Sequence, residues 1–423
     1  MYRAYFLLAT CLLLCPFAGR SARHSAALTG PRSVSRSTRS AALTRTRFAL
    51  VGPADSLAPR MASTVMTLWP DSMTKGRPAR WNYEQGVVLK GMEAVWRTTG
   101  DPRYLAYIRH VIDPFITPEG DIRTYKYEDF TLDNINTGRS LLLLYKETGD
   151  NKYEKAAEQL MEQIRHQPRT SEGGFWHKKT YPGQMWLDGL YMAEPFYAEY
   201  AAMHHEDSVF EDIEKQFVLM EKHARDPKTG LLYHGWDESK REKWADPATG
   251  VSPSFWSRSM GWYGAGLVDA LDYFPKNHPG RKTLLAILRR YAEAVQAVQD
   301  PATGLWWDVL NYPGRDSNYL EASGSCLFVY ILAKAARKGY LPASYLAIAQ
   351  KGYEGIVRKF ISTGPDGQVN LEGTVNVGGL GGNSSHYRDG SYAYYMSERI
   401  VANDPKGIGA FLLASCAIGG PRP

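Results

Sequence analysis

The chain has 423 residues, of which 44% are hydrophobic and 22% are charged, which supports a large core in one large or two ordinary domains. Its formal net charge is +6, but the first 60 residues carry nine Arg and one acid, so residues 61–423 carry a net charge of −2. The basic balance therefore comes from the N-terminal segment, and the charge does not support a nucleic-acid-binding surface on the folded domain.

Two segments precede the predicted folded domain. Residues 1–19 contain the apolar run Tyr5–Cys15, which is too short to span a bilayer and has the length of a signal-peptide core. We predict an export signal here, hence a periplasmic or secreted protein with no other membrane contact. Residues 20–60 are rich in Ser, Ala, Thr and Arg without apolar periodicity, which predicts a disordered linker. An organelle transit peptide is the less favoured alternative for this leader.

From residue 61 to residue 423 the sequence predicts one all-α catalytic domain. Apolar stretches of helical length occur in pairs joined by short polar turns, such as the Thr-Gly-Asp turns at 99–101 and 148–150. The predicted pairs are 84–98 with 103–115, 136–147 with 151–166, 187–203 with 208–224, 260–274 with 281–299, 322–338 with 343–360, and 390–402 with 405–417. A repeat of roughly fifty residues built from one helix pair indicates a repeat architecture.

Six helical hairpins can close into an (α/α)6 barrel, with the first helix of each pair inside and the second outside. An open solenoid of the same hairpins is the alternative. Closure is favoured because the turns within pairs are short, whereas the segments between pairs are long, and long loops in compact domains usually carry function. By alternation, all five long loops lie at the end of the barrel where the inner helices begin.

One acidic residue stands inside an otherwise apolar and aromatic run. Asp188 lies in Gln184-Met-Trp-Leu-Asp-Gly-Leu-Tyr-Met192, where removal from water disfavours the charged carboxylate and favours the protonated form that a general acid needs. The alternative is a helix N-cap after the Pro182-Gly183 turn, with the side chain on free backbone amides. For Asp133, in Thr131–Gly138, an N-cap is the favoured reading from the residues alone.

The long loops are rich in aromatic residues. Eight of the 11 tryptophans fall in or beside them, which suggests flat platforms for stacking; the alternative is that they plug the mouth of the barrel. Polar anchors accompany them, a combination suited to a carbohydrate that carries a carboxylate. The tryptophans are Trp176, Trp186, Trp236, Trp244, Trp256, Trp262, Trp306 and Trp307, and the anchors are His177, His234, Arg258 and Arg388.

Other chemistries have weaker support. The histidines lack the spacing of a zinc site, and only Cys326 and Cys416 lie outside the leader, so neither a metal site nor a disulfide framework is predicted. The glycine run at 378–382 lacks the residues of a phosphate-binding loop.

These motifs together resemble the unsaturated rhamnogalacturonyl hydrolases, glycoside hydrolase family 105, from about residue 75 to the C-terminus. The matching runs are Asp133-Asn-Ile-Asn-Thr-Gly138, Gly174-Phe-Trp-His177, Gln184-Met-Trp-Leu-Asp-Gly-Leu-Tyr-Met192, His234-Gly-Trp236, Trp256-Ser-Arg-Ser-Met-Gly-Trp262, Glu321-Ala-Ser-Gly-Ser325 and Arg388-Asp-Gly-Ser391. The resemblance implies an (α/α)6 barrel, an oligosaccharide substrate and no metal or organic cofactor.

The resemblance also implies a reaction, the hydration of a 4,5-unsaturated uronic acid at a non-reducing end, and roles for particular residues. Asp188 would protonate the double bond, and Asp133 would bind sugar hydroxyls and keep Asp188 protonated by like-charge proximity. The implied substrate-binding residues are His177, Lys178, His234, Trp256, Arg258, Trp262, Trp186 and Arg388. The related unsaturated glucuronyl hydrolases share the fold and the Asp pair, so the oligosaccharide is open.

Three alternatives remain from the sequence alone. The first is the same reaction on glucuronyl or ulvan fragments. The second is a sugar epimerase or polysaccharide lyase, which would need a His or Tyr base where this chain offers Asp188. The third is a non-catalytic sugar-binding helical protein, which would tolerate the loss of Asp188.

Overall fold

The computed structural model describes residues 57–73, 78–382 and 387–420, so the predicted signal and nearly all of the predicted linker lie outside the described part. Helix α1 begins at Leu57, earlier than the domain start predicted at residue 61. Six helices form an inner ring in which each packs against the next. They are α2 (Tyr83–Thr99), α4 (Gly138–Thr148), α6 (Leu187–His204), α8 (Ser257–Ala270), α10 (Ala322–Arg337) and α13 (Pro405–Gly419).

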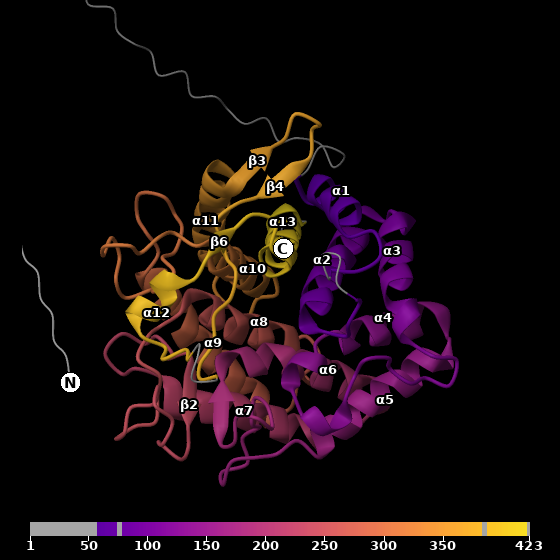
Figure 1. The fold of residues 1–423 in the computed structure, drawn as a ribbon, viewed down its shortest axis with the longest axis horizontal. Helices are drawn as coiled ribbons and strands as arrows, with labels where there is room; N and C mark the ends of the chain where they lie inside the picture. The colour runs from indigo at the N-terminus through magenta and orange to yellow at the C-terminus, as the bar shows by residue number, and fades with distance from the viewer. Residues whose placement is uncertain (1–56, 74–77, 383–386, 421–423) are drawn as a thin grey trace, which may run out of the picture. The chain divides into compact units, whose positions relative to one another are not determined.

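The ring is closed, because α13 packs against α2 and α10 (Figure 1). This contact distinguishes a barrel from the open solenoid, and the predicted (α/α)6 fold is confirmed. Inner helices are buried on several sides, and in α8 all 14 residues are buried. The outer helices are α3 (Pro102–Ile112), α5 (Asn151–Arg165), α7 (Val209–Ala224), α9 (Pro279–Ala297), α11 (Tyr345–Phe360) and α1 (Leu57–Leu68).

The sixth predicted pair, 390–402 with 405–417, is wrong. Helix α12 covers only Tyr392–Ser397, because the chain then extends into β6 (Ile400–Val401), which pairs with β5 (Thr374–Val375). The second member, α13, is an inner helix and not an outer one. Its outer neighbour is α1, from the opposite end of the sequence.

Short strands organise the long loops. Strand β1 (Gln184–Trp186) pairs antiparallel with β2 (Gly235–Asp237), with Trp186 opposite Gly235. Strand β3 (Ile361–Thr363) pairs with β4 (Val369–Leu371) between α11 and α13. The remaining elements are the 3-10 helices η2 (Asp113–Phe115), η3 (Tyr127–Asp129) and η4 (Leu132–Asn134). Among the described residues, no helix is both long and apolar enough to cross a membrane.

Glycines allow the inner helices to approach closely. A Cβ atom on Gly266 of α8 would lie 2.6 Å from the carbonyl oxygen of Leu190 on α6. Backbone atoms of a packed helix cannot move aside without shifting the whole helix, so this contact requires glycine. The α6–α8 packing also sets the distance between the loops that precede the two helices.

We therefore expect Gly266→Ala to destabilise the protein by about 1–3 kcal/mol, because the new methyl group overpacks the α6–α8 contact. The free energy of unfolding from urea titrations followed by circular dichroism measures this loss. Gly419→Ala is the matched control, since no atom lies within 4 Å of a Cβ at that helix end. Equal stability of both variants would contradict the proposed contact.

Candidate active site

Backbone hydrogen bonds join three successive long loops at the end of the barrel where the inner helices begin. The amide of Leu132 donates to the carbonyl of His177 (3.1 Å), and that of His177 donates to the carbonyl of Gln184 (2.8 Å). The amide of Leu187 donates to the carbonyl of His234 (3.0 Å). The starts of α4, α6 and α8 are thereby held together, and the side chains on these loops converge.

Asp188 is the second residue of α6 and its side chain is 14% exposed. Its Oδ2 lies 3.0 Å from Nε2 of His234, whose side chain is fully buried. The other ring nitrogen, Nδ1, lies 2.7 Å from the hydroxyl of Tyr395 on α12. The three side chains thus form a chain that runs from the buried interior to a partly exposed carboxyl group.

The partners assign the tautomer of His234. Burial raises the pKa of Tyr395 well above its ordinary value, so the phenol keeps its proton. With its hydroxyl as donor to Nδ1, a neutral imidazole carries its proton on Nε2, the atom that lies 3.0 Å from Oδ2 of Asp188. Oδ2 of Asp188 therefore faces His234 without the geometry of a hydrogen bond, and Oδ1 is not involved in this contact.

Asp133, in η4, forms a second polar group with Lys178 and His177. Nζ of Lys178 lies 2.6 Å from Oδ2 of Asp133, and Nε2 of His177 lies 3.5 Å from Oδ1. Burial opposes ionisation of Asp133, but Lys178 and His177 outweigh it and lower the pKa of this carboxyl. Asp133 is therefore an ionised group whose charge Lys178 offsets, and its predicted like-charge action on Asp188 is weakened.

Aromatic rings form one wall of the site. The rings of Tyr181, Trp186 and His177 stack in sequence, with centroid distances of 4.9 Å between Tyr181 and Trp186 and 4.6 Å between Trp186 and His177. Burial lowers the pKa of His177 to about 4, although Asp133 opposes this shift, so its imidazole is neutral at physiological pH. The wall is flat and uncharged, as a surface for a sugar ring should be.

Trp256 and Arg258 lie behind this site. Trp256 is 1% exposed, stacks on Tyr395 at 5.7 Å and donates from Nε1 to Asp308 (3.0 Å). Arg258 is 2% exposed, and its guanidinium lies over the Trp256 ring and donates to the carbonyl of Val375. Both residues support the site from within, and Arg258 is committed to protein partners in this arrangement.

The contacts of the other two predicted binding residues are with residues other than Asp188. Trp262 is 1% exposed and stacks on Tyr191 with 4.8 Å between centroids. Arg388 forms a pair of backbone hydrogen bonds with Gly381. Six of the eight loop tryptophans are at most 5% exposed, which favours the plug alternative for most of them; these are Trp186, Trp236, Trp244, Trp256, Trp262 and Trp306.

The N-cap alternatives for the two acids are wrong. The N-cap residue of α6 is Trp186, and that of α4 is Thr137. Asp188 is the second residue of α6, after the N-cap, and Asp133 belongs to η4, so neither carboxyl caps the helix that follows it. Their side chains point instead to His234 and Lys178, which leaves both available for chemistry at the loop surface.

Sequence reasoning missed Tyr395 and Tyr83. Burial raises the pKa of Tyr83, at the start of α2, well above its ordinary value, and the neighbouring acids Glu84 and Asp133 raise it further. A functional tyrosine cannot be recognised from this sequence alone, because the chain has 27 tyrosines. Within the described part of the chain, no three His, Cys, Asp or Glu side chains gather in an arrangement that would hold a metal ion.

Comparisons with known proteins identify the family of the chain. The sequence model of Glycosyl Hydrolase Family 88 matches residues 56–418. A Family 105 glycoside hydrolase from C. acetobutylicum ATCC 824 is 46% identical, with a TM-score of 0.82 over 86% of this chain and 99% of its own. The unsaturated rhamnogalacturonyl hydrolase YesR of Bacillus subtilis is 27% identical over 309 residues, which are 70% of this chain and 83% of YesR.

A more distant structure shares the fold alone. The unsaturated glucuronyl hydrolase of Bacillus sp. GL1 is 14% identical, with a TM-score of 0.62 over 86% of this chain and 95% of its own. Fold and site together define a glycoside hydrolase built on an (α/α)6 barrel. The chain belongs to Glycosyl Hydrolase Family 88, and the predicted relationship to the unsaturated rhamnogalacturonyl hydrolases is confirmed.

Removal of the Tyr395 hydroxyl tests the assigned tautomer. In Tyr395→Phe, Nδ1 of His234 loses its donor, so we expect the Nε2-protonated form to lose population to the Nδ1-protonated form. Imidazole nitrogen chemical shifts of histidine-labelled protein measure the two populations, and His234→Gln identifies the resonances. Unchanged His234 shifts in Tyr395→Phe would contradict the assignment.

The depressed pKa of His177 predicts a pH dependence of stability. The unfolded chain binds a proton at the ordinary pKa of 6.5 and the native protein at about 4, so stability falls as the pH drops between these values. By pH 5 the loss from this residue is about 2 kcal/mol. His177→Gln cannot titrate, so its urea unfolding should lose that much less between pH 7 and pH 5; an identical loss in both proteins would refute the assignment.

Proposed function

We propose that this glycoside hydrolase removes the 4,5-unsaturated uronic acid from the non-reducing end of oligosaccharides produced by polysaccharide lyases, with unsaturated rhamnogalacturonan fragments from pectin as its substrates. The proposal rests on the position of the Asp188 carboxyl group. One of its oxygens, Oδ2, lies 3.0 Å from His234, which in turn contacts Tyr395, and the other oxygen, Oδ1, is left to act on a substrate. The similarity to YesR, an unsaturated rhamnogalacturonyl hydrolase by name, supports the choice of substrate.

The reaction begins with proton transfer from Oδ1 of Asp188 to C4 of the double bond. Positive charge then develops at C5 beside the ring oxygen, and water adds to C5 while the Asp188 carboxylate accepts a proton from it. The product is a hemiketal, which opens and releases the remaining oligosaccharide. Asp188 ends the cycle protonated, so proton and water are balanced without any further reactant.

The surrounding residues have distinct tasks in this scheme. His234 lies 3.0 Å from Oδ2, so in this scheme Oδ1 is the oxygen that carries the transferred proton. The ionised Asp133 accepts hydrogen bonds from sugar hydroxyls, while Lys178 holds it in place. Tyr181, the partly exposed member of the stack with Trp186 and His177, supplies an apolar face for the sugar ring.

A polysaccharide lyase is the second candidate, because His234 and Tyr395 are the residue types that such an enzyme uses as base and acid. Their burial argues against it: His234 is 0% and Tyr395 1% exposed, whereas the Asp188 side chain is 14% exposed. Proton abstraction requires direct contact with the substrate. The carboxyl group is therefore the better placed proton donor or acceptor.

The direction of an absorbance change distinguishes these functions. The conjugated double bond of the substrate absorbs ultraviolet light, so hydration lowers the absorbance and elimination raises it. With lyase-digested rhamnogalacturonan, we expect a fall with the wild-type protein and a rate at least about 100-fold lower with Asp188→Asn, which has no acid proton. Parallel assays on glucuronyl and ulvan fragments determine the substrate preference.

Asp366→Asn is the matched control for this assay, since Asp366 lies exposed in the turn between β3 and β4. It should retain wild-type activity. A rise in absorbance would replace the hydrolase with the lyase. No change on any of the three fragment classes would reject both enzymatic proposals and leave a sugar-binding protein.

A further inference from the structure

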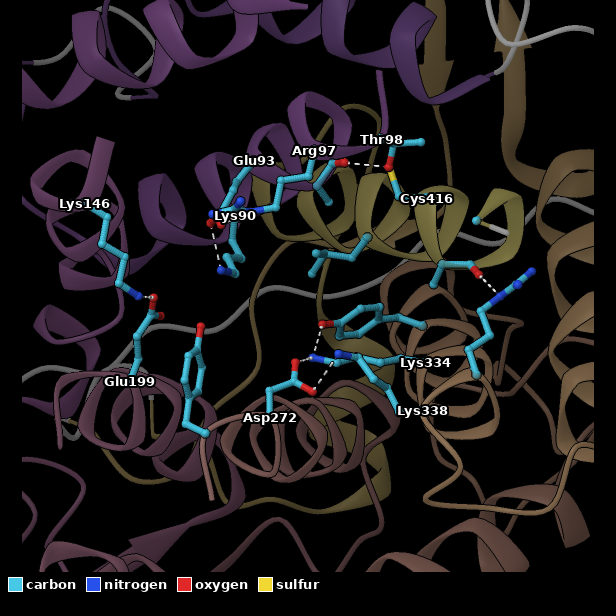
Figure 2. A pocket seen from close by; sticks show the side chains of 17 residues that line it. Lys90, Glu93, Arg97, Thr98, Lys146, Glu199, Asp272, Lys334, Lys338 and Cys416 are labelled. Atoms are coloured by element: carbon cyan, nitrogen blue, oxygen red, sulfur yellow. Dashed lines mark hydrogen bonds and ion pairs between the residues drawn. The ribbon is translucent and has the colours of Figure 1, made fainter. Parts of the chain in front are cut away.

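A second cavity lies at the end of the barrel opposite Asp188, where the inner helices end. Its volume is about 520 Å³, and all six inner helices or the residues directly after them contribute to its lining (Figure 2). The lining includes six basic residues and three acidic ones. The basic residues are Lys90, Arg97, Lys146, Lys334, Arg337 and Lys338, and the acidic ones are Glu93, Glu199 and Asp272.

Three carboxylates in and beside this cavity each contact two cations. Glu93 of α2 lies 2.7 Å from Nζ of Lys90 and 2.8 Å from Nε of Arg97. Two positive charges from one helix therefore face a single negative charge. Lys90 is 16% exposed, so the excess charge is only partly solvated.

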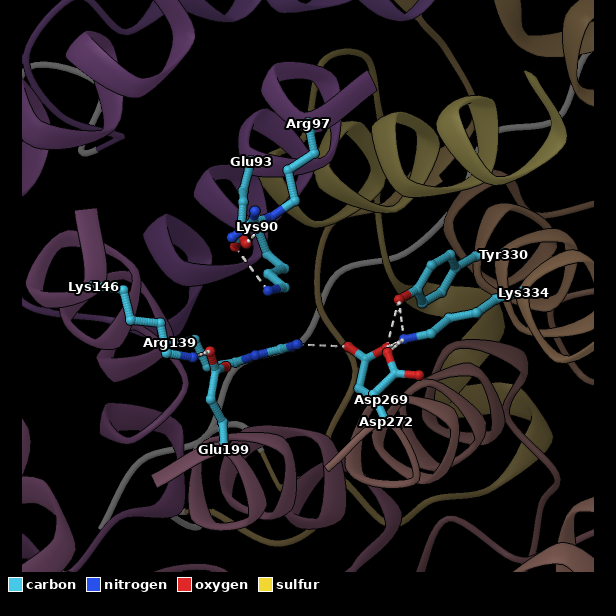
Figure 3. A network of polar contacts seen from close by, with 10 residues as sticks. All are labelled: Lys90, Glu93, Arg97, Arg139, Lys146, Glu199, Asp269, Asp272, Tyr330 and Lys334. Carbon is cyan, nitrogen blue, oxygen red and sulfur yellow. Dashed lines mark hydrogen bonds and ion pairs between the residues drawn. The ribbon is translucent and has the colours of Figure 1, made fainter. Parts of the chain in front are cut away.

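The same sharing occurs across the lumen (Figure 3). Asp269 of α8 is bound by Arg139 of α4 (2.9 Å) and by Lys334 of α10. Asp272 is bound by Lys334 (2.8 Å) and Lys338 (3.6 Å). Counted together with Lys90, Arg97 and Glu93, these contacts bring five cations against only three carboxylates.

Glu93 and Lys334 remain charged at neutral pH. Burial opposes ionisation of Glu93, but Lys90 and Arg97 lower its pKa to about 2. Burial likewise opposes protonation of Lys334, yet Asp269 raises its pKa well above the ordinary value. The cavity therefore holds a permanent excess of positive charge.

The dipoles of the inner helices explain only part of this excess. The negative ends of six helices point to this region, and basic residues in the last turn offset them. Arg337 does so directly, with hydrogen bonds to the carbonyls of Ala417 and Ile418 at the end of α13. The effect is confined to the last turn, whereas Lys90 lies nine residues before the end of α2 and Arg139 nine before the end of α4.

We propose that this cavity binds a small anion with two or more negative charges and several oxygen acceptors, either a polycarboxylate or a polyphosphate. The anion would contact Lys90, which projects into the cavity from α2, and Lys338 at its rim, and would supply the negative charge that the shared carboxylates lack. Tyr273 and Tyr330 line the same space, and the hydroxyl of Tyr330 donates to Asp269.

The cavity is separate from the candidate active site. The side chains that converge on Asp188 lie at or before the starts of α4, α6 and α8, whereas the cavity is lined mainly by the C-terminal halves of the inner helices and the residues directly after them. Binding of an anion therefore stabilises the fold by mass action and leaves the proton donor untouched. The proposal does not depend on the function assigned to Asp188.

Isothermal titration calorimetry of the full chain with citrate or pyrophosphate, each at constant ionic strength, tests the proposal and separates the two anion classes. We expect one site per chain and a Kd that rises roughly tenfold or more in Lys90→Met, since a charge-assisted contact is lost. Lys338→Ala, at the 55% exposed rim, removes a cation without disturbing the interior and should weaken binding in the same direction.

Lys282→Met is the matched control, because this lysine is exposed on outer helix α9 and should leave the Kd unchanged. Absence of heat with both anions would overturn the proposal. So would equal binding by the wild type, Lys90→Met and Lys338→Ala, which would show that the anion binds elsewhere on the surface.

Discussion

Closure of the inner ring is the constraint on which the remaining structure depends. Each inner helix must be buried on both flanks, and the α13–α2 contact completes this arrangement. Glycines allow the close approach: a Cβ on Gly409 of α13 would lie 2.5 Å from the carbonyl oxygen of Val87 on α2. Apolar side chains then fill the helix interfaces, so polar groups are concentrated at the two ends of the barrel and in the lumen between them.

The two ends have opposite electrostatic requirements, because all six inner helices run in the same direction. At their N-terminal end, acids are favoured: Asp188 lies in the first turn of α6, and Glu321 caps α10 by accepting from the amide of Gly324 (2.6 Å). At the C-terminal end, the last turns hold bases such as Arg97 and Lys334. An anionic sugar approaching the loop end meets positive helix ends, whereas an anion at the far end needs additional cations to be held.

Much of the fold could be predicted from the sequence, because five helix pairs are local and their apolar periodicity is visible. The sixth could not, since the outer partner of α13 is α1, more than 300 residues earlier, and no local pattern reports such a pairing. The short α12 was misjudged because Ile400 and Val401 continue an apolar pattern but pair with β5. Tertiary pairing overrode helical periodicity there.

The candidate site could also be predicted only in part from the sequence. Asp133, His177, Asp188 and His234 were predictable because each stands in a long loop or beside a helix start, within a recognisable motif, and Lys178 was implied by the family resemblance. The structure joins Asp133 to His177 and Lys178, and Asp188 to His234. The burial of Arg258 and the contact of Tyr395 with His234 depend on packing between segments far apart in sequence. A motif shows which residue types occur, but packing decides which of them reach the surface.

The pairing of Asp133 with Lys178 changes the account of how Asp188 acts. A neighbouring carboxylate favours protonation of an acid only while its own charge is uncompensated. Lys178 lies 2.6 Å from Asp133 and supplies that compensation, so repulsion between the two acids is a weak device here. In the proposed scheme the contact with His234 takes its place, because the imidazole lies against Oδ2 and leaves Oδ1 to carry the transferred proton. Since Tyr395 contacts Nδ1 of His234, the proposal gives a buried phenol that need not touch the substrate the task of holding this imidazole.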